Sequence, residues 1–149
     1  MKKLLSIVAL SMLALSGLLT APAHAAAVPA NFNVLINLTS ACLLTTPADL
    51  TFNYTSFQAG AASGSTTFNV KCTNTLPFAL SLDLASVTDA ATNLAYTLAL
   101  SGATAAGTGV NQLITVTGTM ALGQVGTCAT ATCTNGASAN KQRILTVTY

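Results

Sequence analysis

The feature that most constrains the fold is the alternation of apolar and polar residues along the chain after residue 30. Apolar side chains recur at every second position, which is the period of a β-strand. The alternating runs cover residues 32–38, 50–54, 68–72, 78–84, 94–100, 114–116 and 145–149. Residues 85–91 could hold at most a turn or two of helix, and no other segment after residue 30 has a helical period. The sequence therefore predicts an all-β chain.

Segments rich in small residues separate the predicted strands and indicate turns. They lie at residues 58–65, 101–109 and 132–140. About seven short strands at this spacing are typical of an immunoglobulin-like β-sandwich. A chain of 149 residues leaves no room for a second domain of ordinary size. We therefore expect one sandwich domain.

The first 25 residues have the three parts of a secretory signal peptide. Lys2 and Lys3 precede an apolar run at residues 4–19, and Ala23-His24-Ala25 forms a small-x-small cleavage site. A membrane anchor is the alternative, but the run is shorter than the roughly 20 residues of a span, and serines and a glycine interrupt it. We expect residues 1–25 to be removed on export.

The charged residues after position 25 are few and balanced. The bases are Lys71, Lys141 and Arg143, and the acids are Asp49, Asp83 and Asp89. This part of the chain contains no Glu, and the one histidine, His24, lies in the signal. Acid/base catalysis and nucleophilic triads need more of these groups. We expect no enzyme, cofactor or metal site, and the lack of a basic patch argues against nucleic acid as a partner.

Four cysteines in an exported domain favour disulfide bonds, and three pairings are possible. We favour Cys42–Cys72 and Cys128–Cys133, because the first two belong to alternating segments and the last two flank a four-residue turn. A zinc site is the competing interpretation. It is disfavoured because no histidine remains after residue 25 and the spacing of Cys128 and Cys133 is wide for a zinc knuckle.

The segment at residues 31–39 is apolar, alternating and uncharged, and it lies close to the predicted cleavage site. Monomeric proteins usually protect an apolar edge strand with charge or proline. Two interpretations are open at this point. The segment is either an ordinary strand of its own domain or a strand that pairs with another chain.

The order of the motifs resembles the spore coat protein U domain, which is shared with the archaic (Csu-type) chaperone–usher pilins. The resemblance covers nearly all of residues 31–149. In chain order, its motifs are Phe32-Asn-Val34-Leu-Ile36-Asn-Leu38, Ser40-Ala41-Cys42, Leu50-Thr51-Phe52-Asn53-Tyr54, Val70-Lys71-Cys72-Thr73, and residues 77–82, 94–98 and 144–149. Where that family has a Gly-x-Tyr-x-Asp segment, this chain has residues 126–143 with the second cysteine pair.

The resemblance implies a structural subunit whose sandwich lacks its last strand. A periplasmic chaperone fills the resulting groove first, and at the outer-membrane usher the N-terminal strand of an identical or related subunit replaces it. Residues 26–41 would be the N-terminal extension and residues 42–149 the pilin domain. By position, the donor strand would present Phe32, Val34, Ile36 and Leu38. The acceptor groove would include Leu145, Val147 and Tyr149, and Cys42–Cys72 would join the first two core strands.

The expected function is therefore a subunit of a linear surface fibre or coat that passes through the periplasm to the cell surface. The alternative is a stand-alone exported β-sandwich that binds a glycan or another envelope protein. The absence of Trp weakens the glycan interpretation, because aromatic side chains supply much of the stacking surface at binding sites.

Overall fold

A computed structural model describes residues 26–149 of the chain. The predicted signal peptide, residues 1–25, lies outside the described residues. The chain divides into a unit that ends at Ile36 and a second unit, Asn37–Tyr149. Residues 26–41 belong to no strand, and the first strand begins at Cys42.

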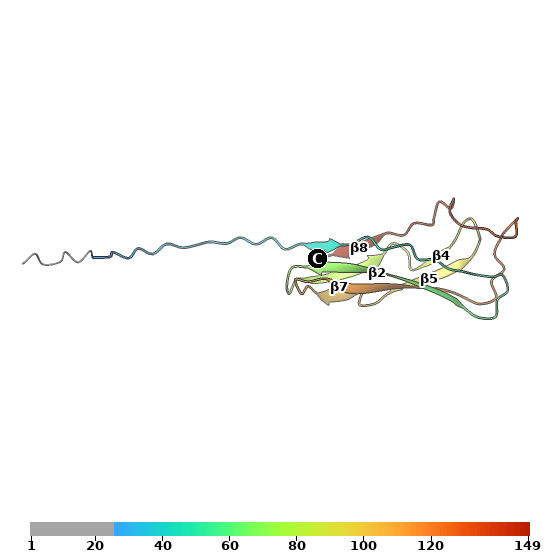
Figure 1. The fold of residues 1–149 in the computed structure, drawn as a ribbon, viewed down its shortest axis with the longest axis horizontal. Coiled ribbons are helices and arrows are strands. Elements are labelled where there is room, and N and C mark those ends of the chain that lie inside the picture. The colour runs from blue at the N-terminus through green and yellow to red at the C-terminus, as the bar shows by residue number, and fades with distance from the viewer. Residues whose placement is uncertain (1–25) are drawn as a thin grey trace, which may run out of the picture. The chain divides into compact units, whose positions relative to one another are not determined.

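The described residues form eight β-strands and contain no helix, as the sequence predicts. The strands, labelled in part in Figure 1, are β1 (Cys42–Leu44), β2 (Ala62–Cys72), β3 (Pro77–Leu82), β4 (Ser86–Thr88), β5 (Ala95–Leu100), β6 (Thr104–Ala106), β7 (Gln112–Met120) and β8 (Leu145–Thr148). Within residues 26–149 there is accordingly no helix that could span a membrane.

The strands form two antiparallel sheets. The larger sheet has the order β1-β2-β7-β5-β4, and the smaller has the order β6-β3-β8. The longest ladder joins β2 to β7, from Ala62 opposite Met120 to Val70 opposite Gln112. This pairing forms because both strands place apolar side chains on one face and Thr, Ser or Asn on the other.

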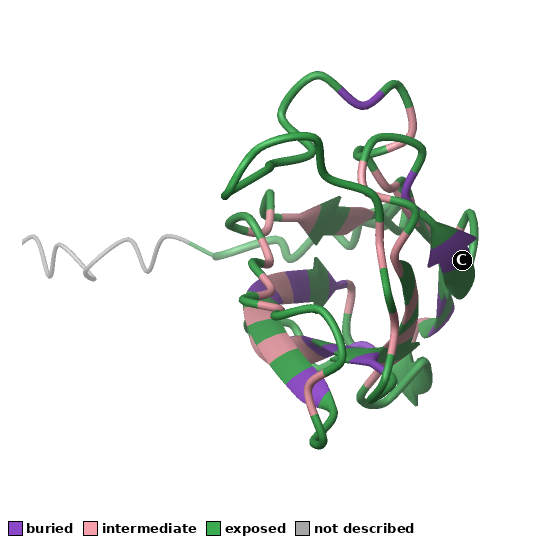
Figure 2. Ribbon diagram, turned by 90° about the vertical axis from the view of Figure 1, so that its right-hand side faces the viewer, coloured by how far each residue is buried: buried purple, intermediate pink, exposed green. Residues whose placement is uncertain are grey.

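The core lies on the inward faces of both sheets. It contains Phe68 and Val70 from β2, Phe78 and Leu80 from β3, and Ile114 and Val116 from β7. Figure 2 shows the resulting alternation of buried and exposed residues along the strands. Each fully buried side chain of this size contributes about 1.5–3 kcal/mol to stability, so alternation is the main determinant of this fold.

The strand predicted at residues 50–54 is not formed. Leu50, Phe52 and Tyr54 are half-buried and alternate with exposed residues, but the segment makes no backbone–backbone hydrogen bond with the rest of the described chain. It instead crosses the inner face of the larger sheet over Gly64 and Gly118, which are paired across β2 and β7. A Cβ atom on Gly64 would lie 2.6 Å from the carbonyl oxygen of Thr51. Glycine at these two positions lets the segment approach the sheet closely.

β4 and β6, two strands of three residues each, were not expected from the sequence, whereas β1, also of three residues, lies at Cys42, where the resemblance implies the first core strand. A run of three residues is too short to show a period. β4 lies in residues 85–91, where at most a turn or two of helix was expected, and β6 lies in the predicted turn 101–109. Both extend a sheet at its edge, where pairing to a neighbouring strand decides the conformation.

Candidate functional site

Of the four edge strands in the described part of the chain, β1, β4, β6 and β8, the strands β1 and β8 lie near each other, because residues of both line one hollow. β1 pairs only with β2, and β8 pairs only with β3. After β1 the chain leaves the larger sheet and continues as the unpaired segment at residues 46–54. An edge of this kind presents N–H and C=O groups that another strand can bind.

A hollow separates these edges. It has a volume of about 350 Å³ and is lined by Leu44–Pro47 on one side and by Arg143, Ile144 and Leu145 on the other. We call it the edge groove. Leu44, Leu50 and Leu145 pack against the core beside it but are only half-buried. The edge groove is therefore an apolar gap between the start of β8 and the chain that follows β1.

The three predicted groove residues do not share one environment. Leu145 and Val147 are half-buried and pack against the core from β8. Tyr149, by contrast, lies beyond the last residue of β8 and is 58% exposed. It lines a separate shallow hollow of about 590 Å³ with the ends of β3 and β6. The ladder ends at the pair Ala79 and Thr148, which leaves Tyr149 without a strand to pack against.

The predicted donor residues are exposed. Phe32 and Ile36 are each 85% exposed, Leu38 is 79% exposed and Val34 is 72% exposed. The segment belongs to neither sheet, so it is not an ordinary strand of its own domain in this structure. A row of large exposed apolar side chains is typical of a binding segment.

The disulfide Cys42–Cys72 holds β1 onto β2 beside the edge groove. The two residues are direct partners in the ladder, with their Cα atoms 4.1 Å apart. Backbone bonding continues past them, since the Thr73 N–H donates to the carbonyl oxygen of Ala41 at 3.0 Å. The pair is one of the two favoured from the sequence, and Cys72 is almost fully buried.

An ion pair fixes the start of β8 at the edge groove. Arg143 lies 3.3 Å from the carboxylate of Asp83, and the Ile144 N–H donates to the same carboxylate at 3.1 Å. Desolvation raises the pKa of Asp83, but the N–H groups of Ile144 and Leu84 and the charge of Arg143 outweigh it, so the pKa is lowered. This part of β8 is therefore positioned by side chains as well as by the ladder.

A second polar cluster fastens the loop at residues 126–143. Asp89, only 4% exposed, accepts hydrogen bonds from the backbone and hydroxyl of Thr92 and from the side-chain amide of Asn135. Desolvation raises the pKa of Asp89, but these hydrogen bonds outweigh it and lower the pKa. Asn140 adds two hydrogen bonds: its side-chain N–H donates to the Thr88 carbonyl oxygen, and its side-chain oxygen accepts from the Ala90 N–H.

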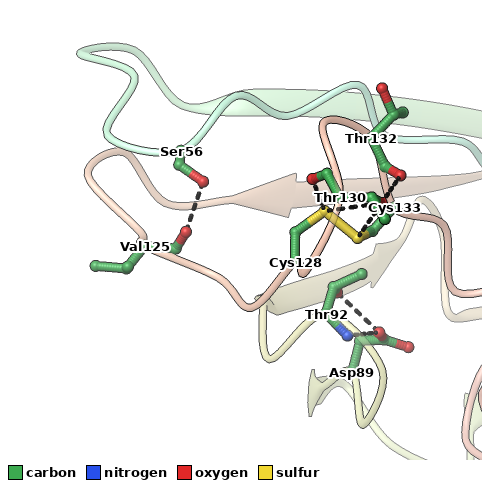
Figure 3. Close-up of a disulfide and its surroundings, with 8 residues drawn as sticks. All are labelled: Ser56, Asp89, Thr92, Val125, Cys128, Thr130, Thr132 and Cys133. Carbon is green, nitrogen blue, oxygen red and sulfur yellow. Dashed lines mark hydrogen bonds between the residues drawn. A yellow bond between two sulfur atoms is a disulfide. The ribbon is translucent and has the colours of Figure 1, made fainter.

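The second disulfide, Cys128–Cys133, closes a five-residue separation within this loop, as favoured from the sequence. Figure 3 shows it near Thr92 and Asp89, with the hydroxyl of Thr130 donating to the carbonyl oxygen of Thr132. Both cysteines are exposed. The disulfide therefore shapes a surface loop, whereas Asp89 and Asn140 attach that loop to the end of β4 and the turn that follows it.

Residues 26–149 contain no group of three or more His, Cys, Asp or Glu side chains that could hold a metal ion. The edge groove is lined by four apolar residues, two threonines and one arginine that is already paired with Asp83. Its chemistry suits a neutral chain segment with apolar side chains. Comparison with models of protein families, with curated protein sequences and with solved structures found no match for this chain.

Proposed function

We propose that the chain is a structural subunit of a surface fibre or coat, assembled by the chaperone–usher route through exchange of donor strands. Its domain is an immunoglobulin-like sandwich that lacks one strand. A strand from a neighbouring subunit completes it by entering the edge groove between β8 and residues 44–54. The subunit has no catalytic role, and it reaches the cell surface after export to the periplasm.

One observation carries this proposal: the same chain has an apolar groove beside an open sheet edge and an exposed, unpaired segment of matching chemistry. The groove has half-buried apolar side chains from β8 and from residues 44–50. The segment at residues 32–38 alternates, is uncharged and is exposed. Strand addition to an open edge uses main-chain hydrogen bonds for affinity and alternate side chains for specificity.

The chain cannot easily fill its own groove. Only residues 39–41 separate Leu38 from Cys42, and Cys42 is fixed to β2 by its disulfide. A chain that reverses direction into the adjacent groove needs a longer connection. Insertion into a second copy is a head-to-tail contact that does not close, and such a contact produces a fibre. Before a fibre forms, a periplasmic chaperone would cover the groove. At the outer-membrane usher the donor strand of another subunit would then replace the chaperone.

The test is polymerisation of the chain from residue 26 to 149, measured by size-exclusion chromatography and negative-stain electron microscopy. We expect linear polymers from the unmodified chain and none after deletion of residues 26–38. A matched pair of charge substitutions sharpens the result. Ile36→Asp places a charge in the apolar row and should abolish polymers, whereas Asn33→Asp places it in the alternate row and should be tolerated.

Equal polymerisation of the two charge variants would contradict insertion of the apolar row. If the unmodified chain is a stable monomer that unfolds when residues 26–38 are deleted, the segment belongs to its own domain. The stand-alone binding module would then be the better description.

A further inference from the structure

Two turns form one end of the domain, which we call the tip, and this end presents three exposed apolar side chains. The turns are residues 55–58 and 121–126, and the side chains are Phe57 at 71% exposure, Leu122 at 61% and Val125 at 60%. The ten residues of these turns include no charged side chain. An uncharged apolar cluster of this kind is a candidate interaction surface.

The two turns are held together by hydrogen bonds. The Phe57 N–H donates to the Gln124 carbonyl at 3.0 Å, and the Gly123 N–H donates to the Gln58 carbonyl at 2.9 Å. The Ser56 hydroxyl donates to the Val125 carbonyl at 2.6 Å, as Figure 3 shows. Phe57 has a φ of 65°, a costly conformation for an aromatic residue. The tip therefore keeps a large apolar side chain in water at a conformational cost.

The opposite end of the domain, which we call the base, is formed by residues 73–76 and 107–111. The Thr75 N–H donates to the Gly107 carbonyl, and the Gly109 N–H donates to the Cys72 carbonyl. The base adjoins Ala41, carries Val110 at 63% exposure and has no charged residue. β2 runs from the tip at Ala62 to the base at Cys72 and separates them by roughly 33 Å.

The direction of the inserted strand decides which end faces the neighbouring subunit. All six strand pairs of the domain are antiparallel. A strand added antiparallel to β8 enters beside Thr148, near the base, and leaves beyond Leu145, toward the tip. The donor's own domain begins only three residues after Leu38, a reach of roughly 10–14 Å. The base of the donor subunit, which holds its Ala41, then lies against the tip of the acceptor.

We propose that the tip of one subunit packs against the base of the next copy in the fibre, with Phe57, Leu122 and Val125 contacting the surface around Val110. This contact rests on the proposed function, since it exists only between subunits joined by strand insertion. It explains why an uncharged, hydrogen-bonded tip exposes apolar side chains. It also gives the joint between subunits a defined orientation instead of a flexible connection.

The chain contains no Trp, so a single introduced tryptophan reports on one site. In polymers of the Val110→Trp chain we expect emission at shorter wavelength and weaker acrylamide quenching than in Val110→Trp polymers that also carry Phe57→Asn and Leu122→Ser. Asn tolerates a positive φ, so the first of these substitutions relieves strain at position 57. Leu84→Trp is the matched control: Leu84 is exposed but belongs to neither end, and its emission should not respond to the tip substitutions.

Electron microscopy of the same samples separates the two proposals. If the emission wavelength and quenching of Val110→Trp polymers are the same with and without the tip substitutions, the tip–base contact is overturned. Strand insertion would still hold, because the polymers form. Absence of polymers from the unmodified chain would overturn both. If the doubly substituted tip fails to fold, Val125→Ser alone replaces it, and an unchanged Val110→Trp spectrum in its polymers would equally overturn the contact.

Discussion

At the scale of single residues, Gly118 shows how one missing Cβ atom permits the inner packing. A methyl group there would meet the ring of Phe52 and lie 3.0 Å from the side chain of Leu50. We expect Gly118→Ala to destabilise the domain by about 1–3 kcal/mol, since overpacking forces neighbours off their rotamers. Gly60→Ala is the control, because nothing lies within 4 Å of its added Cβ atom. Urea unfolding measures both, and an equal stability of the two variants would contradict the close approach of residues 50–54.

Asp89 gives a prediction about pH at the same scale. Its pKa is lowered in the folded chain from the ordinary 3.8, so its hydrogen bonds stabilise the fold above that value and are lost as the pH falls through the folded pKa. Asp89→Ala should cost about 2–4 kcal/mol at neutral pH, because it removes the hydrogen bonds that the buried carboxylate accepts from Thr92 and Asn135. It should also flatten the decline in stability below about pH 4. Asp49→Ala, at an exposed position, is the control. If Asp89→Ala and Asp49→Ala have the same stability in urea unfolding, Asp89 does not stabilise the fold in this way.

At the scale of elements, the sequence is informative wherever a strand is long and has one buried face. β5 and β8 lie within predicted runs, and β3 begins one residue before its run, since their alternation reflects the burial of one face. β2 and β7 contain the runs at 68–72 and 114–116 but are longer, and β2 begins at Ala62, inside the segment 58–65 that was expected to be a turn. The small residues there still pair with β7, because the partner strand decides the conformation. Residues 50–54 alternate for the same reason but lack a ladder, because alternation reports a buried face and says nothing about a neighbouring edge. The short strands β4 and β6 depend on partners that a local pattern cannot reveal.

The two disulfides should differ in importance as the elements they join differ. Cys42–Cys72 closes a 30-residue separation between β1 and β2, and Cys128–Cys133 closes five residues within a loop. In the chain-entropy model these are worth about 3.7 and 2.2 kcal/mol. Cys42→Ser also leaves a buried thiol at Cys72 beside the core. We expect Cys42→Ser to prevent accumulation of the exported chain and Cys133→Ser to be tolerated, and equal periplasmic yields would contradict this ranking.

At the scale of the whole molecule, the candidate site combines segments that are far apart in sequence. Leu145 and Val147 were expected in the groove because the resemblance places the acceptor groove on the final strand. Two other parts of its lining, Leu44–Pro47 on the opposite side and Arg143 before β8, were not expected there, because neither has a periodic signal. Their proximity depends on where the chain leaves the larger sheet after β1. The resemblance also assigns Tyr149 to the groove, but Tyr149 lies one residue beyond Thr148, the last residue of β8 with a ladder partner.

If the groove lacks one strand, supplying that strand in the same chain should complete the fold. We expect a chain that lacks residues 26–38, and carries a copy of residues 31–38 after Tyr149 through a flexible linker, to be a soluble monomer. Tyr149 is exposed and directly follows the last residue of β8, near the base, so a linker from it can lead the added strand back along β8 in the antiparallel direction. Covering the half-buried Leu145 and Val147 should raise the melting temperature above that of the deleted chain. The matched control appends the same eight residues with Asp at the positions of Val34 and Ile36. An equal melting temperature for the two appended chains would show that the groove does not take the apolar row.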